Sequence, residues 1–317
     1  MHRERWVILP IVVAGMMGTL GSAPLVSQEQ ERPAEPLIRP DTNIAVTGDS
    51  IRRALGGLPD SSGTSGDSLG KEADTLQVHV WRTVENKAFG VGEKLVFDVS
   101  YGMITAGEAI LEIPQTVSID GRQTFAVEVQ VNSLPSFSWI YKVEDVYRTF
   151  IDVQSIAPLR FEQRIREGSY KRDFVATFDQ ARHIARTTDG KEFPIPPYVH
   201  DIMSAFYFFR TIDFRGRATG DVIMLQNFYK DRTHDLEVRI LGRQELEVEA
   251  GTFNTIVLEP MVREGGLFKN EGRIVVWLSD DELKIPLRIN SKVVIGSIDT
   301  ELREYSGLQG RPSARIR

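Results

Sequence analysis

Histidine, aspartate and serine, the side chains of a hydrolytic relay, lie close together in the sequence at His200, Asp201 and Ser204. In such a relay the carboxylate orients the imidazole, which then takes the proton of the serine hydroxyl. No G-x-S-x-G turn surrounds Ser204, and residues on one local turn cannot easily reach that geometry. A structural role is the stronger prediction, in which Asp201 begins a helix and its carboxylate accepts from the amide of Ser204.

A run of acids, Asp280, Asp281 and Glu282, follows Trp277 and precedes Pro286. Consecutive carboxylates could bind calcium or serve as a paired acid and base, but the D-x-D-x-D-G pattern of a calcium loop is absent. Acids between two strands usually form a solvated turn. We therefore expect a turn here, with the Asp280 carboxylate accepting backbone amides.

Metal and cofactor sites have little support in the sequence. The histidines are scattered, the chain has no cysteine, and no glycine-rich phosphate loop is present. We therefore expect neither a metal nor a cofactor. The formal net charge is −6 and the pI about 5.5, without a block of Lys and Arg, so nucleic acid is not an expected partner.

Charge alternates with apolar residues in one segment, where Arg160, Arg164 and Arg166 occupy the strand face opposite Phe161 and Ile165. Mixed charge at alternate positions predicts a solvent-facing ladder of cross-strand pairs. A surface for an anionic ligand is the alternative.

Aromatic residues are more suggestive of binding. Phe137, Trp139 and Tyr141 alternate, which predicts one strand with three rings on one face. Most of the other aromatic side chains should pack in the core. A curved sheet with this supply of rings could still leave a cavity for an acyl chain or a glycan, of roughly 300–1,000 Å³ as in other ligand pockets.

One segment predicts a helix. Prolines at 194, 196 and 197 stop extended pairing, and apolar residues then recur at helical spacing between Asp201 and Arg210. A helix that is apolar almost all round should be buried. We expect it to lie in the concavity of a curved sheet.

Strand-like alternation begins near Lys87 and continues to Tyr305 in short segments separated by turn residues. About twelve segments follow one another without helix-length crossovers, which predicts antiparallel hairpins. So many strands must curl into a barrel or half-barrel, or split into two layers. The expected fold class is mainly β: a curved antiparallel sheet, half-barrel or barrel with one short buried helix. Gly102 and Gly107 are expected either to mark bends of the sheet or to be plain turn glycines.

The first 27 residues have a charged head, a long apolar run and small residues after it, which predicts a signal peptide. An uncleaved N-terminal anchor is the alternative. Residues 28–86 are rich in Pro, Ser and Gly and predict a disordered linker. Residues 87–306 should form the β domain and residues 307–317 a flexible tail. We expect a periplasmic location, with no membrane span after cleavage.

Three separated motifs are similar to those of a known family. They are residues 91–102 with Ala106 and Gly107, residues 201–210, and residues 277–302. Together, over roughly residues 88–306, they resemble the bacterial exported family known as domain of unknown function 3108. The resemblance implies an envelope-located, predominantly antiparallel β domain and supplies no reaction. On architecture alone, the expected sheet is similar to that of Lol-type periplasmic lipoprotein carriers.

These features favour a non-catalytic protein of the cell envelope that binds a hydrophobic, lipid-like component, a glycan or a protein partner. The alternative is an envelope hydrolase or glycan-modifying enzyme that uses His200, Asp201 or the acids around Asp280. A third hypothesis is a structural role in envelope assembly, through edge-strand pairing or the linker. The candidate binding residues are Asp201, Ser204, Tyr207, Arg210, Trp139, Tyr141, Trp277 and Asp280.

Overall fold

The computed structural model describes residues 80–262, 273–292 and 296–316. The predicted signal peptide (residues 1–27) and the predicted linker as far as residue 79 lie outside the described residues. Within the described ranges, no helix has both the length and the apolar character needed to cross a membrane.

Fourteen strands form a single antiparallel sheet in the order β8-β7-β6-β5-β4-β3-β2-β1-β14-β13-β12-β11-β10-β9. Apart from β8 and β9, which are the two edges, strands that follow one another in sequence are neighbours, and the pairing of β1 with β14 joins the two halves of the sheet. The strands are β1 (Lys94–Tyr101), β2 (Ile104–Ile119), β3 (Arg122–Ser133), β4 (Glu144–Asp152), β5 (Pro158–Glu167), β6 (Tyr170–Asp179), β7 (Ile184–Thr187), β8 (Glu192–Pro194), β9 (Val222–Tyr229), β10 (Arg232–Val248), β11 (Gly251–Val262), β12 (Ile274–Ser279), β13 (Pro286–Lys292) and β14 (Ser297–Ser306).

The predicted curved antiparallel sheet is confirmed, with differences in strand number. The sequence predicts about twelve strands, and the described residues form fourteen. Gly242, a residue type common in turns, does not end β10: the strand continues through it with a bulge, where Gly242 has a φ of 141°. A bulge adds one unpaired residue and bends the strand without ending it.

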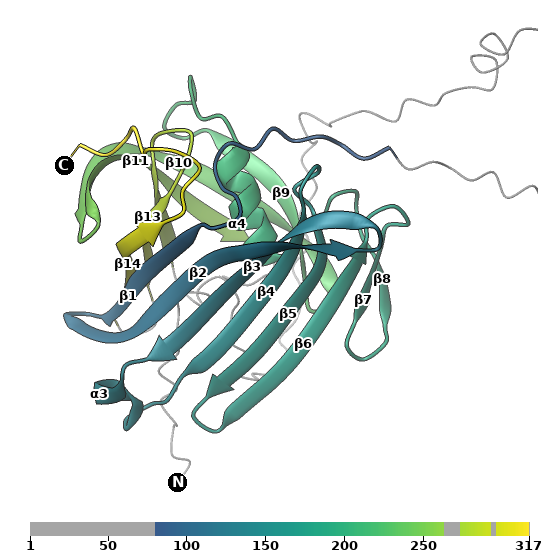
Figure 1. Ribbon diagram of the computed structural model, residues 1–317, viewed down its shortest axis with the longest axis horizontal. Coiled ribbons are helices and arrows are strands. Elements are labelled where there is room, and N and C mark those ends of the chain that lie inside the picture. The colour runs from purple at the N-terminus through teal and green to yellow at the C-terminus, as the bar shows by residue number, and fades with distance from the viewer. Residues whose placement is uncertain (1–79, 263–272, 293–295, 317) are drawn as a thin grey trace, which may run out of the picture. The chain divides into compact units, whose positions relative to one another are not determined.

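The sheet curves strongly around its core (Figure 1). One bend lies in β2, where the register against β1 shifts beside Gly107. A Cβ atom on Gly107 would lie 2.8 Å from the Asn132 carbonyl oxygen of β3, so only glycine fits this close approach. Gly102, by contrast, is a turn glycine with a φ of 60°.

The two edge strands, β8 and β9, are brought together by the residues just before helix α4 (Ile202–Thr211). The His200 amide donates to the Gln226 carbonyl at 2.9 Å, and the Phe228 amide donates to the His200 carbonyl at 2.7 Å. The rings of Phe193 on β8 and Phe228 on β9 lie 5.8 Å apart. The described sheet is therefore barrel-like, although no continuous ladder of hydrogen bonds joins its edges.

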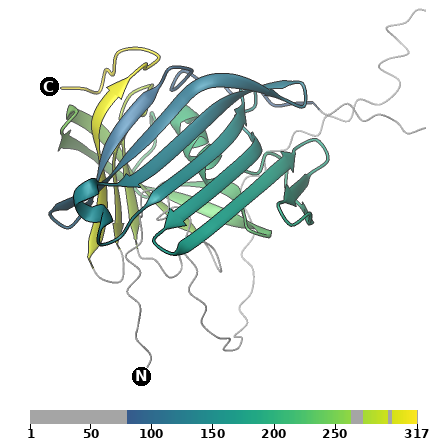
Figure 2. The ribbon, with the colours of Figure 1, turned by 60° about the horizontal axis from the view of Figure 1, so that its bottom comes forward.

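Helix α4 (Ile202–Thr211) lies on the concave side of the sheet (Figures 1 and 2). Asp201 is its N-cap, and the amides of Met203 and Ser204 donate to its carboxylate. Seven of its ten residues are buried. The predicted helix, its N-cap and its position are thus confirmed.

A second helix, α3 (Pro135–Ser138), occupies the connection between β3 and β4. The prediction of a strand carrying Phe137, Trp139 and Tyr141 on one face is therefore wrong. Pro135 stands in the first turn of α3, where its missing amide costs nothing. The Ser138 hydroxyl donates to the Leu134 carbonyl at 2.8 Å and closes the short helix.

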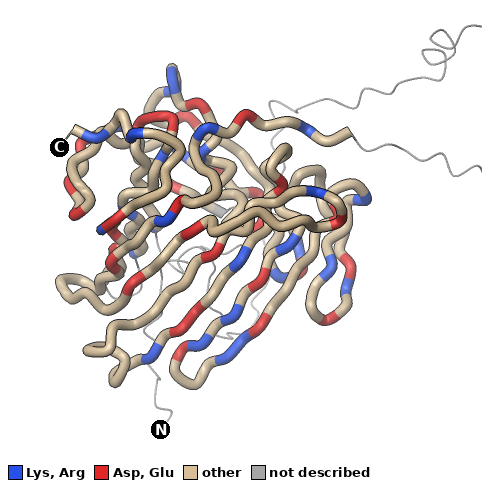
Figure 3. The backbone as a smooth tube through the Cα atoms, in the orientation of Figure 1, with Lys and Arg blue, Asp and Glu red and all other residues tan. Residues whose placement is uncertain are grey.

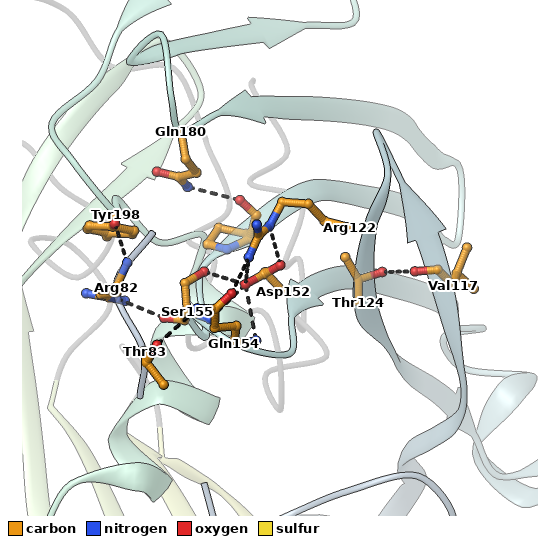
Figure 4. A network of polar contacts seen from close by, with 11 residues as sticks. Arg82, Thr83, Val117, Arg122, Thr124, Asp152, Gln154, Ser155, Gln180 and Tyr198 are labelled. Atoms are coloured by element: carbon orange, nitrogen blue, oxygen red, sulfur yellow. Dashed lines mark hydrogen bonds and ion pairs between the residues drawn. The ribbon is translucent and has the colours of Figure 1, made fainter. Parts of the chain in front are cut away.

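The N-terminal described segment, which belongs to the predicted linker, packs against the sheet (Figure 4). The Arg82 amide donates to the Tyr198 hydroxyl at 2.7 Å, and Arg82 Nε donates to the Ser155 carbonyl at 2.8 Å. In the same network Arg122 donates to both carboxylate oxygens of Asp152, at 2.6 and 2.9 Å. Burial acts to raise the pKa of Asp152, but these bonds outweigh it and hold the pKa below its usual value.

The C-terminal described segment, for which the sequence predicts a flexible tail, runs beside β11. The Asn254 amide donates to the Ala314 carbonyl at 2.9 Å, and the Ala314 amide donates to Asp281 Oδ2 at 3.0 Å. Ala314 itself is buried. These contacts attach residues around 314 to the sheet.

Candidate ligand-binding site

Three apolar hollows line the concave side of the sheet. The β10 hollow, between α4 and strands β10–β12, is lined by Ile202, Ala205, Phe206, Phe209, Leu236, Val238, Leu258, Pro260, Val276 and Leu278. The β1 hollow, on the other side of α4, is lined by Phe97, Ala109, Leu111, Val129, Met203, Phe206, Tyr207, Pro286, Ile289 and Thr300. The α3 hollow is lined by Val99, Ser100, Tyr101, Ala106, Gly107, Val131, Asn132, Ser133, Phe137, Tyr141, Val143 and Ile298.

Each hollow is small, with a cavity volume of about 40–50 Å³. Drug-sized ligands occupy pockets of roughly 300–1,000 Å³. Among the described residues, the concave face therefore has no open cavity of the predicted size, because aromatic and branched side chains fill it. A hollow of about 580 Å³ lies instead along the C-terminal segment, where Tyr305, Arg311 and Ile316 line it. Each of the three hollows on the concave side has room for a few methylene groups.

Phe206 separates the β10 hollow from the β1 hollow, because it lines both. Its side chain is only partly buried, whereas the neighbouring Ala205 and Tyr207 are fully buried. This one side chain therefore lies between the two hollows.

The β1 and α3 hollows follow one another along the same strands. Phe97 and Val99 on β1 line successive hollows, as do Val129 and Val131 on β3. Residues two apart in a strand point to the same face. The lining therefore continues along the concave face from α4 toward α3.

Asp201 fixes the start of α4. Its Oδ1 accepts from the amides of Met203 and Ser204 at 2.8 and 2.9 Å, and its Oδ2 accepts from the Thr149 hydroxyl of β4 at 2.7 Å. Burial raises the pKa of Asp201, and these hydrogen bonds oppose the rise. The carboxylate thus joins the helix to the sheet.

Arg210 fixes the end of α4 through a buried ion pair with Glu93. Nη1 and Nη2 donate to the two Glu93 oxygens at 2.6 and 2.7 Å, and neither side chain is exposed. Nη2 also donates to the carbonyls of Ala88 and Leu283, at 3.1 and 3.2 Å. Burial acts to lower the pKa of Arg210, but the Glu93 carboxylate outweighs it and raises the pKa above its ordinary value.

His200 and Ser204 are in contact but do not form a hydrolytic relay with Asp201. His200 Nδ1 lies 3.3 Å from Ser204 Oγ, and all three residues are buried. Burial, assisted by the nearby Arg82 guanidinium, holds the pKa of His200 well below its usual value. Because the Asp201 carboxylate is directed at backbone amides and Thr149, it does not orient the imidazole.

The acidic turn differs from its prediction. Asp281, not Asp280, accepts from backbone amides, those of Leu283 and Lys284 at 3.1 and 3.2 Å. Asp280 instead forms an ion pair with Arg243 at 2.8 Å. The reason is that only one of two adjacent side chains can face the turn interior, and here that side chain also binds the Ser279 hydroxyl.

The remaining predicted binding residues divide into two groups. Tyr207 and Tyr141 line the β1 and α3 hollows respectively. Trp139 and Trp277 lie outside the linings of the three hollows. Trp139 is exposed just after α3. The ring centre of Trp277 lies 5.8 Å from the guanidinium carbon of Arg288 on β13. Sequence reasoning missed Glu93, which carries no local sign of its role.

The arginine face of β5 matches the predicted charge ladder (Figure 3). Arg160 pairs with Glu162 of the same strand at 2.6 Å, whereas Arg166 pairs across strands with Asp173 of β6 at 2.8 Å. Arg164 is exposed on the same face. Because two of these arginines are already neutralised by acids, the outer face of β5 gives little support to an anionic ligand.

Two buried acids lie behind the α3 hollow. The Tyr141 hydroxyl donates to Glu167 Oε2 at 3.4 Å, and the Tyr147 hydroxyl donates to Asp145 Oδ2 at 3.4 Å. Burial, together with the neighbouring Asp145 carboxylate, raises the pKa of Glu167 to about 8. Within the described ranges, no three potential metal ligands converge.

A family model described as protein of unknown function (DUF3108) matches residues 96–303. The chain belongs to the DUF3108 family. The matched part of this DUF3108 protein contains α4 and every residue that lines the three hollows. It excludes Glu93, although Glu93 anchors α4.

Among solved structures, a β-barrel-like protein of domain of unknown function 1849 from Brucella abortus aligns with a TM-score of 0.46 and 10% identity, over 71% of this DUF3108 chain and 98% of that chain. A candidate exported protein with a YmcC-like fold from Bacteroides fragilis aligns with a TM-score of 0.28 and 12% identity, over 72% and 100% of the two chains. A candidate lipoprotein from Parabacteroides distasonis aligns with a TM-score of 0.32 and 10% identity, over 71% and 99%. No curated protein matches the chain.

Proposed function

We propose that this protein binds a hydrophobic component of the cell envelope, of the acyl-chain type, on the concave face of its sheet. The observation that carries the proposal is the series of three apolar hollows, divided beneath α4 by the partly exposed Phe206. An acyl chain fits such a lining because it requires apolar contact along its length and few polar partners.

Anchoring of α4 at both ends supports a binding role for Phe206. The Asp201 cap holds the first turn, and the Arg210–Glu93 pair holds the last. Because the helix is fixed, we expect Phe206 to yield to a ligand by changing its rotamer while the backbone stays in place. The two hollows would then become one channel without repacking the core.

The polar residues that a hydrolase would need for catalysis already have structural partners, which supports binding over catalysis. His200, Asp201 and Ser204 are buried and engaged in holding α4, and Asp280 pairs with Arg243. The linings of the hollows are formed almost wholly by apolar side chains. The N-terminal sequence pattern supports action in the envelope, where lipid-like ligands are abundant.

Variants that change the size of the side chain at position 206 test the proposal. Full-length protein would be purified, its bound lipid extracted and identified by mass spectrometry, and the lipid-free protein titrated with a fluorescent fatty acid. Phe206→Ala joins the two hollows and should tighten binding several-fold, while Phe206→Trp fills them and should weaken it. Phe208→Ala is the matched control, because Phe208 is on the same helix, is also partly buried and lines none of the hollows.

Two results would overturn the proposal. One is that neither the wild type nor Phe206→Ala carries extractable lipid or binds the fatty acid. The other is that Phe208→Ala changes binding as much as the Phe206 variants, because the effect would then come from helix stability. Capture of a protein in place of lipid would favour the protein-partner alternative.

A further inference from the structure

Large apolar side chains are exposed at one end of the sheet. In the β1–β2 turn Met103 is fully exposed and Ile104 is 62% exposed, and after α3 Trp139 and Ile140 are 81% and 54% exposed. Among the described residues, the only other large apolar side chain that is more than half exposed is that of Val80, which is the first residue the structure describes. A concentration of this kind marks an interaction surface.

The connections that carry these side chains lie side by side. The Leu134 amide, just before α3, donates to the Ala106 carbonyl of β2 at 2.9 Å, and the Gly168 amide of the β5–β6 turn donates to the Lys142 carbonyl at 2.8 Å. Tyr170, which follows that turn, is 49% exposed. Figure 2 shows α3 and the β1–β2 turn at the same end of the sheet. We call the exposed side chains Met103, Ile104, Trp139, Ile140 and Tyr170 the apolar rim.

The apolar rim borders the α3 hollow. Tyr101 and Ala106 of the β1–β2 hairpin, with Phe137 and Tyr141 of the α3 connection, are part of the lining of that hollow. The rim therefore continues the apolar lining of the concave face outward to the solvent.

Charge at this end differs from that of the whole chain. The net charge of the chain is −6, and Lys142, the charged residue between β3 and β4, pairs with Glu144 at 2.9 Å. Lys171 and Arg172 follow Tyr170 directly, and in the described part of the chain Lys171 has no acid within ion-pair distance. Exposed apolar and aromatic side chains flanked by lysine and arginine match the interface of an anionic bilayer, where rings lie at the headgroups and cations meet lipid phosphates.

We propose that the apolar rim docks the domain on an anionic lipid bilayer. Met103 and Trp139 enter the boundary between headgroups and acyl chains, and Lys171 and Arg172 contact the headgroups. The docking surface is independent of what the hollows bind, so it goes beyond the proposed function. It also places the mouth of the α3 hollow against the bilayer.

The absence of cysteine from the chain allows a site-specific test. An environment-sensitive fluorophore would be attached to Ile140→Cys at the rim, or to Met224→Cys as the matched control, which lies on β9 and is 49% exposed. Vesicles of phosphatidylcholine, with and without phosphatidylglycerol, would then be added to the full-length protein. We expect the rim label to brighten at least about twofold and shift to the blue on anionic vesicles, and the control label to stay unchanged.

A second measurement compares the wild type with a variant that lacks the two most exposed side chains of the apolar rim. Met103→Ser combined with Trp139→Ser should reduce sedimentation with anionic vesicles at least about tenfold, because two large apolar side chains no longer leave water. Val222→Ser combined with Met224→Ser is the control and should have little effect. The N-terminal apolar run is common to all variants, so only differences between variants count. Circular dichroism and urea midpoints would verify folding.

Several outcomes would overturn the proposal. The fluorescence of the rim and control labels could change equally on addition of vesicles. The change of the rim label could be the same with and without phosphatidylglycerol. The Met103→Ser, Trp139→Ser variant could sediment with anionic vesicles as well as the wild type. A rim label that responds to protein concentration without vesicles would show self-association of the chain, and would overturn it as well. Fatty-acid binding by the rim variant should remain that of the wild type, which separates this proposal from the proposed function.

Discussion

The buried pair of Glu93 and Arg210 offers the strongest quantitative prediction. Replacing Glu93 by glutamine removes the negative charge and keeps the size of the side chain. The Arg210 guanidinium then stays buried without a counter-charge, since its other acceptors are the neutral carbonyls of Ala88 and Leu283. Breaking one side of a buried ion pair costs about 3–5 kcal/mol.

This cost is large compared with the free energy of unfolding of a typical domain, about 5–15 kcal/mol. With a urea m-value of about 2–3 kcal/mol per molar, the midpoint of Glu93→Gln should fall by about 1–2.5 M. The control is Asp213→Asn, whose ion pair with Arg215 at 2.7 Å is highly exposed. Its midpoint should not change measurably, because water and salt screen exposed pairs.

A double-mutant cycle separates the ion pair from general packing. Arg210→Met alone leaves the Glu93 carboxylate buried and should also be strongly destabilising. Arg210→Met combined with Glu93→Gln leaves no buried charge, so the double variant should lose less than the sum of the two single losses, by roughly 1–3 kcal/mol. Additive losses, or a loss below about 1 kcal/mol for Glu93→Gln, would refute the reasoning.

Two further predictions concern other buried acids, and both are measured by urea unfolding. Asp201→Ala should cost about 1–2 kcal/mol, because it removes the cap of α4, whereas Asp201→Asn should retain most of the stability; equal losses would contradict the capping role. Because the folded-state pKa of Glu167, about 8, lies above its ordinary value of 4.5, the folded protein binds more protons than the unfolded chain between these values. Stability should therefore fall as pH rises from about 5 to about 8, and Glu167→Gln should flatten that dependence; an unchanged slope in the variant would contradict it.

The helix α4 could be predicted because its signals are local. Asp201, the preceding prolines and the apolar spacing all lie within a few residues of one another. The same applies to the antiparallel hairpins, whose turns carry pairs such as Asp120 and Gly121, with φ of 49° and 78°.

Other features have no local signal. Glu93 and Arg210 are 117 residues apart, and nothing near Glu93 distinguishes it from an ordinary turn acid. The alternation at Phe137, Trp139 and Tyr141 is too short to separate a strand from a helical turn started by Pro135. Which of Asp280 and Asp281 faces the backbone amides depends on the direction of the turn, and alternation does not encode that direction.

The pairing of β1 with β14 constrains how the domain is made. These strands are central in the sheet and lie at opposite ends of the domain sequence; their contact is reinforced by an ion pair between Asp98 and Arg303, which are 205 residues apart. During synthesis from the N-terminus, β1 can pair with β2 along one edge, but its other edge has no partner until β14 has been made. Contacts of such long sequence separation form slowly. Folding of the whole sheet therefore awaits completion of the chain, so the first strands remain without part of their partners until the last strand is available.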